Sequence, residues 1–346
     1  MSPSEPSERF LRACRCLPVD ATPVWFMRQA GRYMPEYRRV REKYSLLEIV
    51  RHPEVAAEVT LQPVRSLGVD AAILFADILL PVIPMGLELE FARGEGPLIR
   101  NPVRSLKDVQ NLRPLTPESD LGEVMETVRL VRHELEGKTP LIGFAGAPFT
   151  VASYVIEGGA SRDFRLTKSL MYSEPEAWQA LMGKLAEDLA AYLQAQVRAG
   201  AQALQVFDSW VGALSPQDYA CYVRPYSQQL FEALKACDVP VIHFGTGTAT
   251  LLSQMKGAGG SVIGLDWRIP LDEGRRLLGD GVAVQGNLDP AALFAPLPVL
   301  RQQVQDVLQR AGGPGHIFNL GHGILQGTPV ENVRRVVDMV HELTAG

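Results

Sequence analysis

The feature of this sequence that most limits its fold is an alternation of short apolar runs with longer amphipathic stretches. The apolar or β-branched runs predict buried strands, and the stretches between them have the spacing of amphipathic helices. Strict alternation favours a parallel sheet covered by helices, and eight such units favour a closed (β/α)8 TIM barrel over an open sheet. The strands are predicted at residues 24–27, 71–75, 141–144, 203–207, 241–244, 262–265, 282–285 and 317–320.

The same pattern predicts the domain organisation. No linker rich in Pro, Gly or Ser divides the 346 residues, so we expect one α/β barrel domain over residues 1–346, in which 1–20 form an N-terminal extension. Several Pro and Gly residues within 79–117 predict an elaborated loop with a small hairpin. The helices are predicted at residues 54–67, 121–135, 174–199, 216–236, 248–256, 271–278, 299–310 and 330–343.

Polar side chains gather just past the predicted strand ends. The carboxyl ends of barrel strands meet at one face, where such enzymes have their active sites, so we expect the active-site cleft there. Any one of these residues could simply satisfy backbone groups of its loop, but that explanation is poor for the whole set. The set comprises Arg28, Arg32, Asp77, Tyr154, Asp208, Ser209, His243, Asp266, Asn287 and His322.

The charges in this set indicate the kind of ligand. Arg28 and Arg32 lie on either side of Gly31, and guanidinium groups bind carboxylates or phosphates through a planar fork of donors. A basic, solvated helix start is the alternative for this pair. Asp77 precedes the apolar segment 78–85, where a carboxylate is costly unless a cation or hydrogen-bond donor meets it. Together they favour a large, partly apolar ligand with N–H donors at its centre and carboxylates at its rim.

One segment resembles a known family. Residues 23–39, PVWFMRQAGRYMPEYRR, are similar almost residue for residue to the N-terminal signature of the uroporphyrinogen decarboxylase family. The stretch RQAGRYMPEY within it is too long to recur by chance, and the resemblance covers essentially the whole chain. The other matching motifs are FADI at 75–78, GAPFT at 146–150, FDSW at 207–210 and NLGHG at 319–323.

The resemblance implies a carboxy-lyase of porphyrin and haem biosynthesis. Such an enzyme removes the acetate carboxylates of uroporphyrinogen III to give coproporphyrinogen III and carbon dioxide. It implies no cofactor, no metal ion and a homodimer, and it leaves the proton donor open between a histidine and an arginine. By resemblance, the catalytic residues are Asp77, Arg28 and His322, and the substrate-binding residues are Arg28, Gln29, Ala30, Gly31, Arg32, Asp77, Tyr154, Ser209 and His322.

Composition narrows the possible partners. The net charge of −5 provides no overall attraction to nucleic acid or to an anionic membrane. No stretch approaches the ~20 uninterrupted apolar residues of a membrane span, and residues 1–16 lack the apolar core of a signal peptide. The four cysteines are too few and too scattered for a disulfide framework. We therefore expect a cytoplasmic enzyme with a small-molecule substrate.

Three other functions are alternatives. GTGT at 245–248 is a weak phosphate-binding signal, and loops after the last two strands bind phosphate in many barrels. Zinc-dependent methyltransferases of the same superfamily carry His-x-Cys after the fifth strand and a later cysteine, whereas this chain has HFG at 243–245 and no cysteine after Cys237. His243 is therefore predicted to be a hydrogen-bonded strand-end residue. A tetrapyrrole carrier would share the pocket but would not need Asp77.

Overall fold

A parallel sheet of seven strands forms the centre of the molecule, in the order β1-β4-β5-β6-β7-β8-β9. The computed structural model describes residues 7–92 and 96–346. Every neighbouring pair in this sheet is parallel, which confirms the predicted α/β class. The strands are β1 (Ala72–Ile73), β4 (Leu141–Gly146), β5 (Ala203–Asp208), β6 (Val241–Gly245), β7 (Val262–Gly264), β8 (Ala283–Gln285) and β9 (His316–Ile317).

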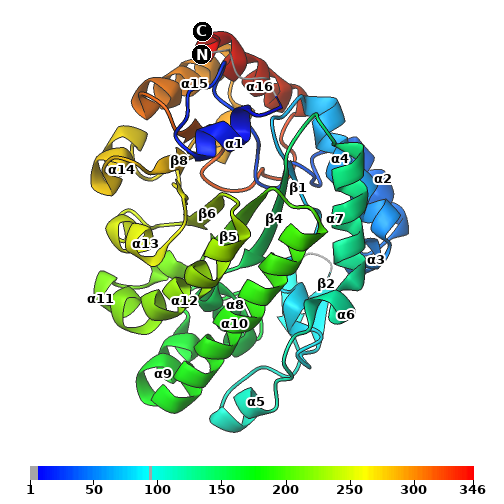
Figure 1. Ribbon diagram of the computed structural model, residues 1–346, viewed down its shortest axis with the longest axis vertical. Coiled ribbons are helices and arrows are strands. Elements are labelled where there is room, and N and C mark those ends of the chain that lie inside the picture. Colours follow the sequence, from blue (N-terminus) through cyan, green and yellow to red (C-terminus); the bar gives the residue numbers. More distant parts are fainter. Residues whose placement is uncertain (1–6, 93–95) are drawn as a thin grey trace.

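Helices surround this sheet in Figure 1. Their apolar faces pack on the strands, so the strands are buried on both faces and largely apolar. Within the described residues, no helix is both long and apolar enough to cross a membrane. The α-helices are α1 (Arg9–Cys14), α2 (Pro35–Lys43), α3 (Leu46–Arg51), α4 (Pro53–Leu67), α5 (Leu106–Gln110), α6 (Pro117–Asp120), α7 (Gly122–Glu134), α8 (Pro148–Glu157), α9 (Arg165–Ser173), α10 (Pro175–Ala199), α11 (Pro216–Asp218), α12 (Arg224–Leu234), α13 (Leu252–Ala258), α14 (Leu271–Leu278), α15 (Leu297–Ala311) and α16 (Val330–Thr344).

The first apolar run does not form the strand that was predicted for it. Val24 makes a single parallel bridge with Phe318, and the rest of the run has no strand ladder. Distant side chains accept two of its backbone N–H groups instead. Asp70 accepts the Val24 N–H at 2.7 Å, and the Asn319 side chain accepts the Met27 N–H at 3.1 Å. These bonds leave the segment extended but irregular, so the prediction of a regular strand was wrong.

The insert after β1 contains the predicted hairpin. Its antiparallel strands are β2 (Leu89–Ala92) and β3 (Gly96–Ile99), whose register pairs Leu89 with Ile99. This small sheet is separate from the central one. The short 3-10 helix η1 (Leu80–Val82) precedes it and begins two residues after the end of the FADI motif.

The helix predicted at 216–236 is interrupted. A π-helical segment, η3 (Tyr219–Val223), separates α11 from α12, and the 3-10 helix η4 (Lys235–Cys237) ends the run. Pro225 has no N–H to donate to the carbonyl four residues earlier, which favours a locally wider turn at this point. Two further 3-10 helices, η2 (Val211–Ala213) and η5 (Pro290–Phe294), follow β5 and β8.

Candidate active site

The carboxyl ends of the parallel strands share one edge of the sheet, and four of the predicted residues interact there. The positive charge of Arg28 acts to lower the pKa of Asp77, Tyr154 and His322, and the Asp77 charge acts to raise that of Tyr154. They come from the loop that follows the first apolar run, the end of β1, helix α8 and the loop after β9. Residues more than 290 positions apart in sequence are thus neighbours in the fold.

Arg28 is held in an unusual backbone conformation. Its φ of 61° lies in the left-handed region, which costs a residue with a side chain some strain. The neighbouring Met27 carbonyl accepts the Ile324 N–H at 2.9 Å, which fixes this loop to the chain after β9. Gly323 leaves the space that the Arg28 side chain occupies, since a Cβ there would lie 2.5 Å from Arg28 Cδ. The exposed guanidinium therefore lies against the loop that carries His322.

The residues after Arg28 differ in what they offer a ligand. Gln29 is buried, and its side chain donates to the Ala71 carbonyl at 3.0 Å and accepts the Phe26 N–H at 3.1 Å. Its hydrogen bonds hold the loop to the sheet. A Cβ at Gly31 would lie 2.9 Å from the Arg28 carbonyl oxygen, so glycine is required for this close approach. Ala30 is half-buried and Arg32 is exposed.

Asp77 is a half-buried carboxyl group just past β1. Burial raises its pKa, whereas the Leu79 N–H and the positive charge of Arg28 act in the opposite direction. Its Oδ1 accepts the Leu79 N–H at 2.9 Å. Burial prevails, so the pKa of Asp77 is raised, and the hydrogen bond and the neighbouring cation compensate only in part.

Tyr154 reaches the same place from helix α8. Pro148 occupies the first turn of this helix, where its missing N–H costs nothing. The Tyr154 ring packs against Trp210 with 5.9 Å between ring centroids. Burial raises the pKa of Tyr154 and the Asp77 charge adds to that effect, while Trp210 and Arg28 oppose it. The phenol is therefore neutral and keeps a proton to donate.

His322 lies in the loop after β9 and is half-buried. Burial lowers its pKa, and the positive charges of Arg28 and Arg268 lower it further. The Gly323 backbone and the Asp266 carboxylate act in the opposite direction. At neutral pH the imidazole is therefore uncharged, and it can bind an anion through a ring N–H but not through a formal charge.

Ser209 follows the last residue of β5 and is half-buried. The Thr246 hydroxyl donates to its backbone carbonyl at 2.6 Å, and the adjacent Trp210 N–H donates to Thr150 Oγ1 at 3.2 Å. Thr150 in turn donates to Asp208 Oδ1 at 3.0 Å. Because Thr150 belongs to α8, this chain of bonds joins the Ser209 turn to the helix that carries Tyr154.

The other four members of the predicted set are buried behind the rim. Asp208 and His243 are both inaccessible to solvent, with 3.7 Å between Asp208 Oδ2 and His243 Nε2. Within the described part of the chain neither His243 ring nitrogen has a hydrogen-bond partner, so the prediction of a hydrogen-bonded strand-end histidine was wrong. Asp266 accepts the Gly247 N–H at 2.5 Å, and Asn287 donates to the Asp266 carbonyl at 2.8 Å. These residues hold the loops that form the rim.

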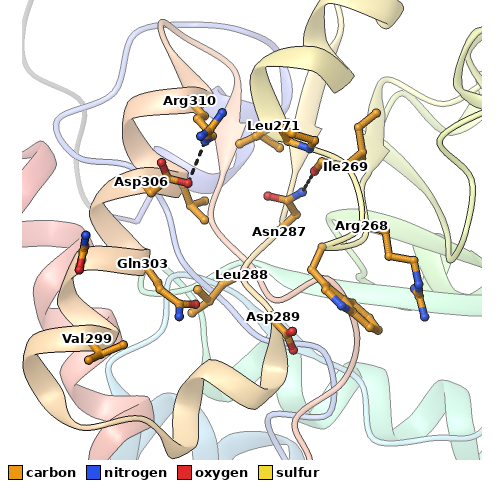
Figure 2. A pocket seen from close by; sticks show the side chains of 14 residues that line it. Arg268, Ile269, Leu271, Asn287, Leu288, Asp289, Val299, Gln303, Asp306 and Arg310 are labelled. Carbon is orange, nitrogen blue, oxygen red and sulfur yellow. Dashed lines mark hydrogen bonds and ion pairs between the residues drawn. The ribbon is translucent and has the colours of Figure 1, made fainter.

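A hollow lies beside this edge, past β7 and β8. Its volume is about 710 Å³, and Figure 2 shows the residues that line it. Arg268 lies on one side, and Asp306 and Arg310 lie on the other side, on α15. Arg268 was not among the residues predicted from the sequence, although it lies two residues after Asp266, which was predicted to lie past a strand end. Among residues 7–92 and 96–346, no group of three or more His, Cys, Asp or Glu side chains is arranged to hold a metal ion.

Known proteins resemble this chain both in fold and in sequence. The solved structure of a methyltransferase from Methanosarcina mazei has a TM-score of 0.79 at 21% identity, with 98% of both chains covered. A likeness at this identity shows a shared fold alone. Among curated proteins, uroporphyrinogen decarboxylase of Sorangium cellulosum is 61% identical over 97% of this chain and 96% of its own length. The uroporphyrinogen decarboxylase of Thermus thermophilus is 58% identical over 98% of this chain and 99% of its own length.

The family model described as uroporphyrinogen decarboxylase (URO-D) matches residues 5–343. This range includes each motif that carried the resemblance, from RQAGRYMPEY to NLGHG. The chain therefore belongs to the uroporphyrinogen decarboxylase family.

Proposed function

We propose that this protein is a uroporphyrinogen decarboxylase, which removes the acetate carboxylates of uroporphyrinogen III and releases coproporphyrinogen III and carbon dioxide. Membership of the family supports the reaction class. The observation that carries the proposal is the position of Asp77, a half-buried carboxyl group whose charge interacts with Arg28 and Tyr154 at the carboxyl edge of the sheet.

The chemistry explains why such a site can work without a bound cofactor. Loss of carbon dioxide leaves an electron pair that needs an acceptor. A pyrrole protonated at the carbon next to the acetate-bearing one becomes an iminium-like cation and accepts that pair itself. The protein must supply a proton, stabilise the positive ring and hold the carboxylates. Preorganised electrostatic stabilisation of this kind is usually the largest catalytic contribution.

Each residue has a role in this proposal. Asp77 accepts the pyrrole N–H groups and stabilises the cationic ring. Arg28 and Arg32 bind substrate carboxylates through their guanidinium forks, and both side chains are exposed to a ligand. His322 binds a carboxylate through a ring N–H, and the neutral phenol of Tyr154 donates a hydrogen bond. The remaining proposed contacts are the Ser209 hydroxyl and the backbone of Gln29, Ala30 and Gly31.

We also propose that the central sheet closes into a (β/α)8 barrel, with the cleft at the carboxyl ends of its strands. Backbone bonds on both sides of the first apolar run support closure. The Asp70 N–H donates to the Val24 carbonyl at 2.8 Å, and the Phe318 N–H donates to the Pro23 carbonyl at 2.8 Å. A homodimer, expected from the resemblance to the family, and a cytoplasmic location, expected from the composition and the scattered cysteines, complete the proposal.

Anaerobic incubation with uroporphyrinogen III tests the function. After oxidation of the products, the number of carboxylates on each porphyrin is counted by chromatography. We expect conversion from eight carboxylates to four without added metal, flavin or pyridoxal phosphate. The absence of any product below eight carboxylates would contradict the activity. Loss of turnover on exhaustive chelation, with recovery on return of one specific metal, would contradict the cofactor-independent chemistry.

A further inference from the structure

Arg268 is an arginine at the carboxyl edge to which the proposed reaction assigns no role. It lies just after β7, in a turn that follows Asp266 and Trp267. Its side chain is 53% exposed, whereas the Asp266 side chain is 1% exposed. Arg268 Nη1 donates to Asp266 Oδ2 at 2.5 Å, and its guanidinium carbon lies 4.0 Å from the centre of the Trp267 ring. The side chain is thus held in place while part of it faces solvent.

The turn that carries Arg268 directly contacts the loop that carries His322. A Cβ at Gly321 would lie 2.3 Å from the Trp267 nitrogen, so the two backbones meet with no space between them. Both Arg28 and Arg268 lower the pKa of His322. Arg28 lies in the loop after the first apolar run, and Arg268 lies in the turn after β7. Two guanidinium groups from different parts of the sheet edge therefore act on one imidazole.

The two arginines that line the neighbouring hollow differ in how many carboxylates they already pair with. Arg310 pairs with Asp306 at 2.8 Å and with Asp272 at 3.2 Å, so two carboxylates neutralise it. Arg268 has a single carboxylate partner among the described residues, at one of its guanidinium nitrogens. A guanidinium has five N–H donors, so several remain for a ligand. Figure 2 shows Arg268 on the side of the hollow away from Arg310.

We propose that Arg268 is a further substrate-binding residue, whose guanidinium binds a carboxylate side chain of the tetrapyrrole on the β7 side of the site. The inference rests on the proposed function. A substrate with carboxylates around the whole ring needs cations on more than one side to be held in one orientation. Arg28 and Arg32 supply them from the chain after the first apolar run, and Arg268 supplies one from the loop after β7.

Steady-state kinetics with uroporphyrinogen III test this role in the full-length protein. We expect Arg268→Gln to raise KM by about 10-fold, the low end for loss of a hydrogen bond to a charged group. We expect kcat to change by less than about 2-fold, because Arg268 binds a non-reacting carboxylate equally in ground and transition states. The matched control is Arg276→Gln on α14, which removes the same charge from a side chain that is 71% exposed.

The salt dependence of KM separates binding from a merely structural role. Arg268 also supports buried Asp266, and loss of that support alone would not change how steeply KM rises with ionic strength. Loss of a substrate-binding cation makes that rise shallower, since one attraction fewer remains to be screened. A shallower rise for Arg268→Gln, with wild-type steepness for Arg276→Gln, is the result that we expect.

Several outcomes would overturn the inference. One is an unchanged KM in Arg268→Gln, and another is a raised KM with wild-type salt dependence. An equal change of KM in Arg276→Gln would also overturn it, because loss of net charge alone would then explain the result. In each case turnover by the wild-type protein leaves the proposed function intact. Failure of the wild-type protein to act on uroporphyrinogen III would instead remove the function itself.

Discussion

At the scale of single residues, the Asp77 carboxylate depends on the neighbouring positive charge of Arg28. Burial disfavours the Asp77 carboxylate, and the Arg28 charge partly compensates. Arg28 in turn has a left-handed backbone, beside a loop in which Gly323 leaves room for its side chain. Such strain is found where the surrounding structure enforces one geometry, as at many functional sites. The charge placement at this edge therefore depends on backbone geometry as well as on residue type.

Removal of the Asp77 charge is the sharpest test at this scale. Asp77→Asn is nearly isosteric and keeps an acceptor oxygen, so substrate can still bind. We expect turnover per folded molecule to fall by on the order of 100-fold or more, comparable with the loss of one preorganised electrostatic group. Asp77→Glu keeps the charge but displaces it by a methylene, so it should recover part of the loss.

A structural role for Asp77 predicts a different result. Its Oδ1 accepts the Leu79 N–H, so either variant could weaken this loop. Thermal unfolding measures that effect, and the folded fraction corrects the turnover for it. Normal turnover per folded molecule in a destabilised Asn variant would show that Asp77 caps the loop and does not take part in catalysis.

The candidate site residues that the sequence predicts are those with short motifs around them. Arg28, Asp77, Tyr154 and His322 each lie in or beside such a motif, just past an apolar run. The supporting contacts could not be identified in this way. Thr150 is bonded to Asp208, which lies 58 positions away in the chain. Pairing over such a separation depends on which strands become neighbours in the fold, and a single sequence does not show which strands these are.

At the scale of elements, strands were predictable where both faces of the sheet are covered. Every residue of β4 is buried, and its continuous apolar run is the signal for this environment. The first apolar run is similarly apolar, yet the side chains of Asp70 and Asn319 accept two of its N–H groups. Helices α8 and α9 were missed because they lie within the long interval between two predicted strands. Apolar pattern thus predicts burial more reliably than it predicts hydrogen-bond partners.

His316, in β9, links an element to the pH dependence of stability. It is 5% exposed, and its Nε2 lies 2.8 Å from the Gly286 carbonyl just past β8. The carbonyl can only accept, so Nε2 carries the proton. Burial is the main cause that lowers the pKa of His316 to about 4. An unfolded histidine has a pKa of about 6.5, so between these two values the unfolded chain binds a proton that the folded protein does not.

The free energy of unfolding should therefore fall as the pH decreases through this window. The slope contributed by one such group is at most about 1.4 kcal/mol per pH unit. His316→Gln keeps an amide donor for the Gly286 carbonyl but cannot titrate. Urea unfolding of both proteins at several pH values from about 7 to about 4.5 measures the difference between their stabilities. We expect the wild-type protein to lose more stability than the variant on acidification, and parallel curves would contradict this assignment.

At the scale of the whole molecule, one ion-pair cluster joins distant parts of the chain on the side opposite the site. Asp70 precedes β1, and its Oδ1 accepts from Arg9 of α1 at 2.9 Å. Its Oδ2 lies 2.7 Å from His341 Nε2 of α16 and accepts the Val24 N–H. Arg9 also pairs with Asp20. The cluster thus ties the first and last helices to the start of the sheet, as the adjacent α1 and α16 in Figure 1 illustrate.

Replacement of Arg9 tests how much this cluster stabilises the fold. Arg9 is 8% exposed, so Arg9→Met leaves the buried Asp70 carboxylate without its guanidinium. We expect a loss of about 3 kcal/mol in the free energy of unfolding, typical of breaking a buried ion pair by removing one partner.

Arg12→Met on the same helix is the matched control. Arg12 makes a solvent-exposed hydrogen bond to the Pro18 carbonyl, so this variant should change the free energy of unfolding by less than about 0.5 kcal/mol. Asp70 and Asp77 lie at opposite ends of β1, so turnover per folded molecule should stay at the wild-type level in both variants. Equal stability of the two variants in urea would mean that the cluster contributes no net stabilisation, and a loss of turnover confined to Arg9→Met would mean that this end of the sheet is coupled to the site.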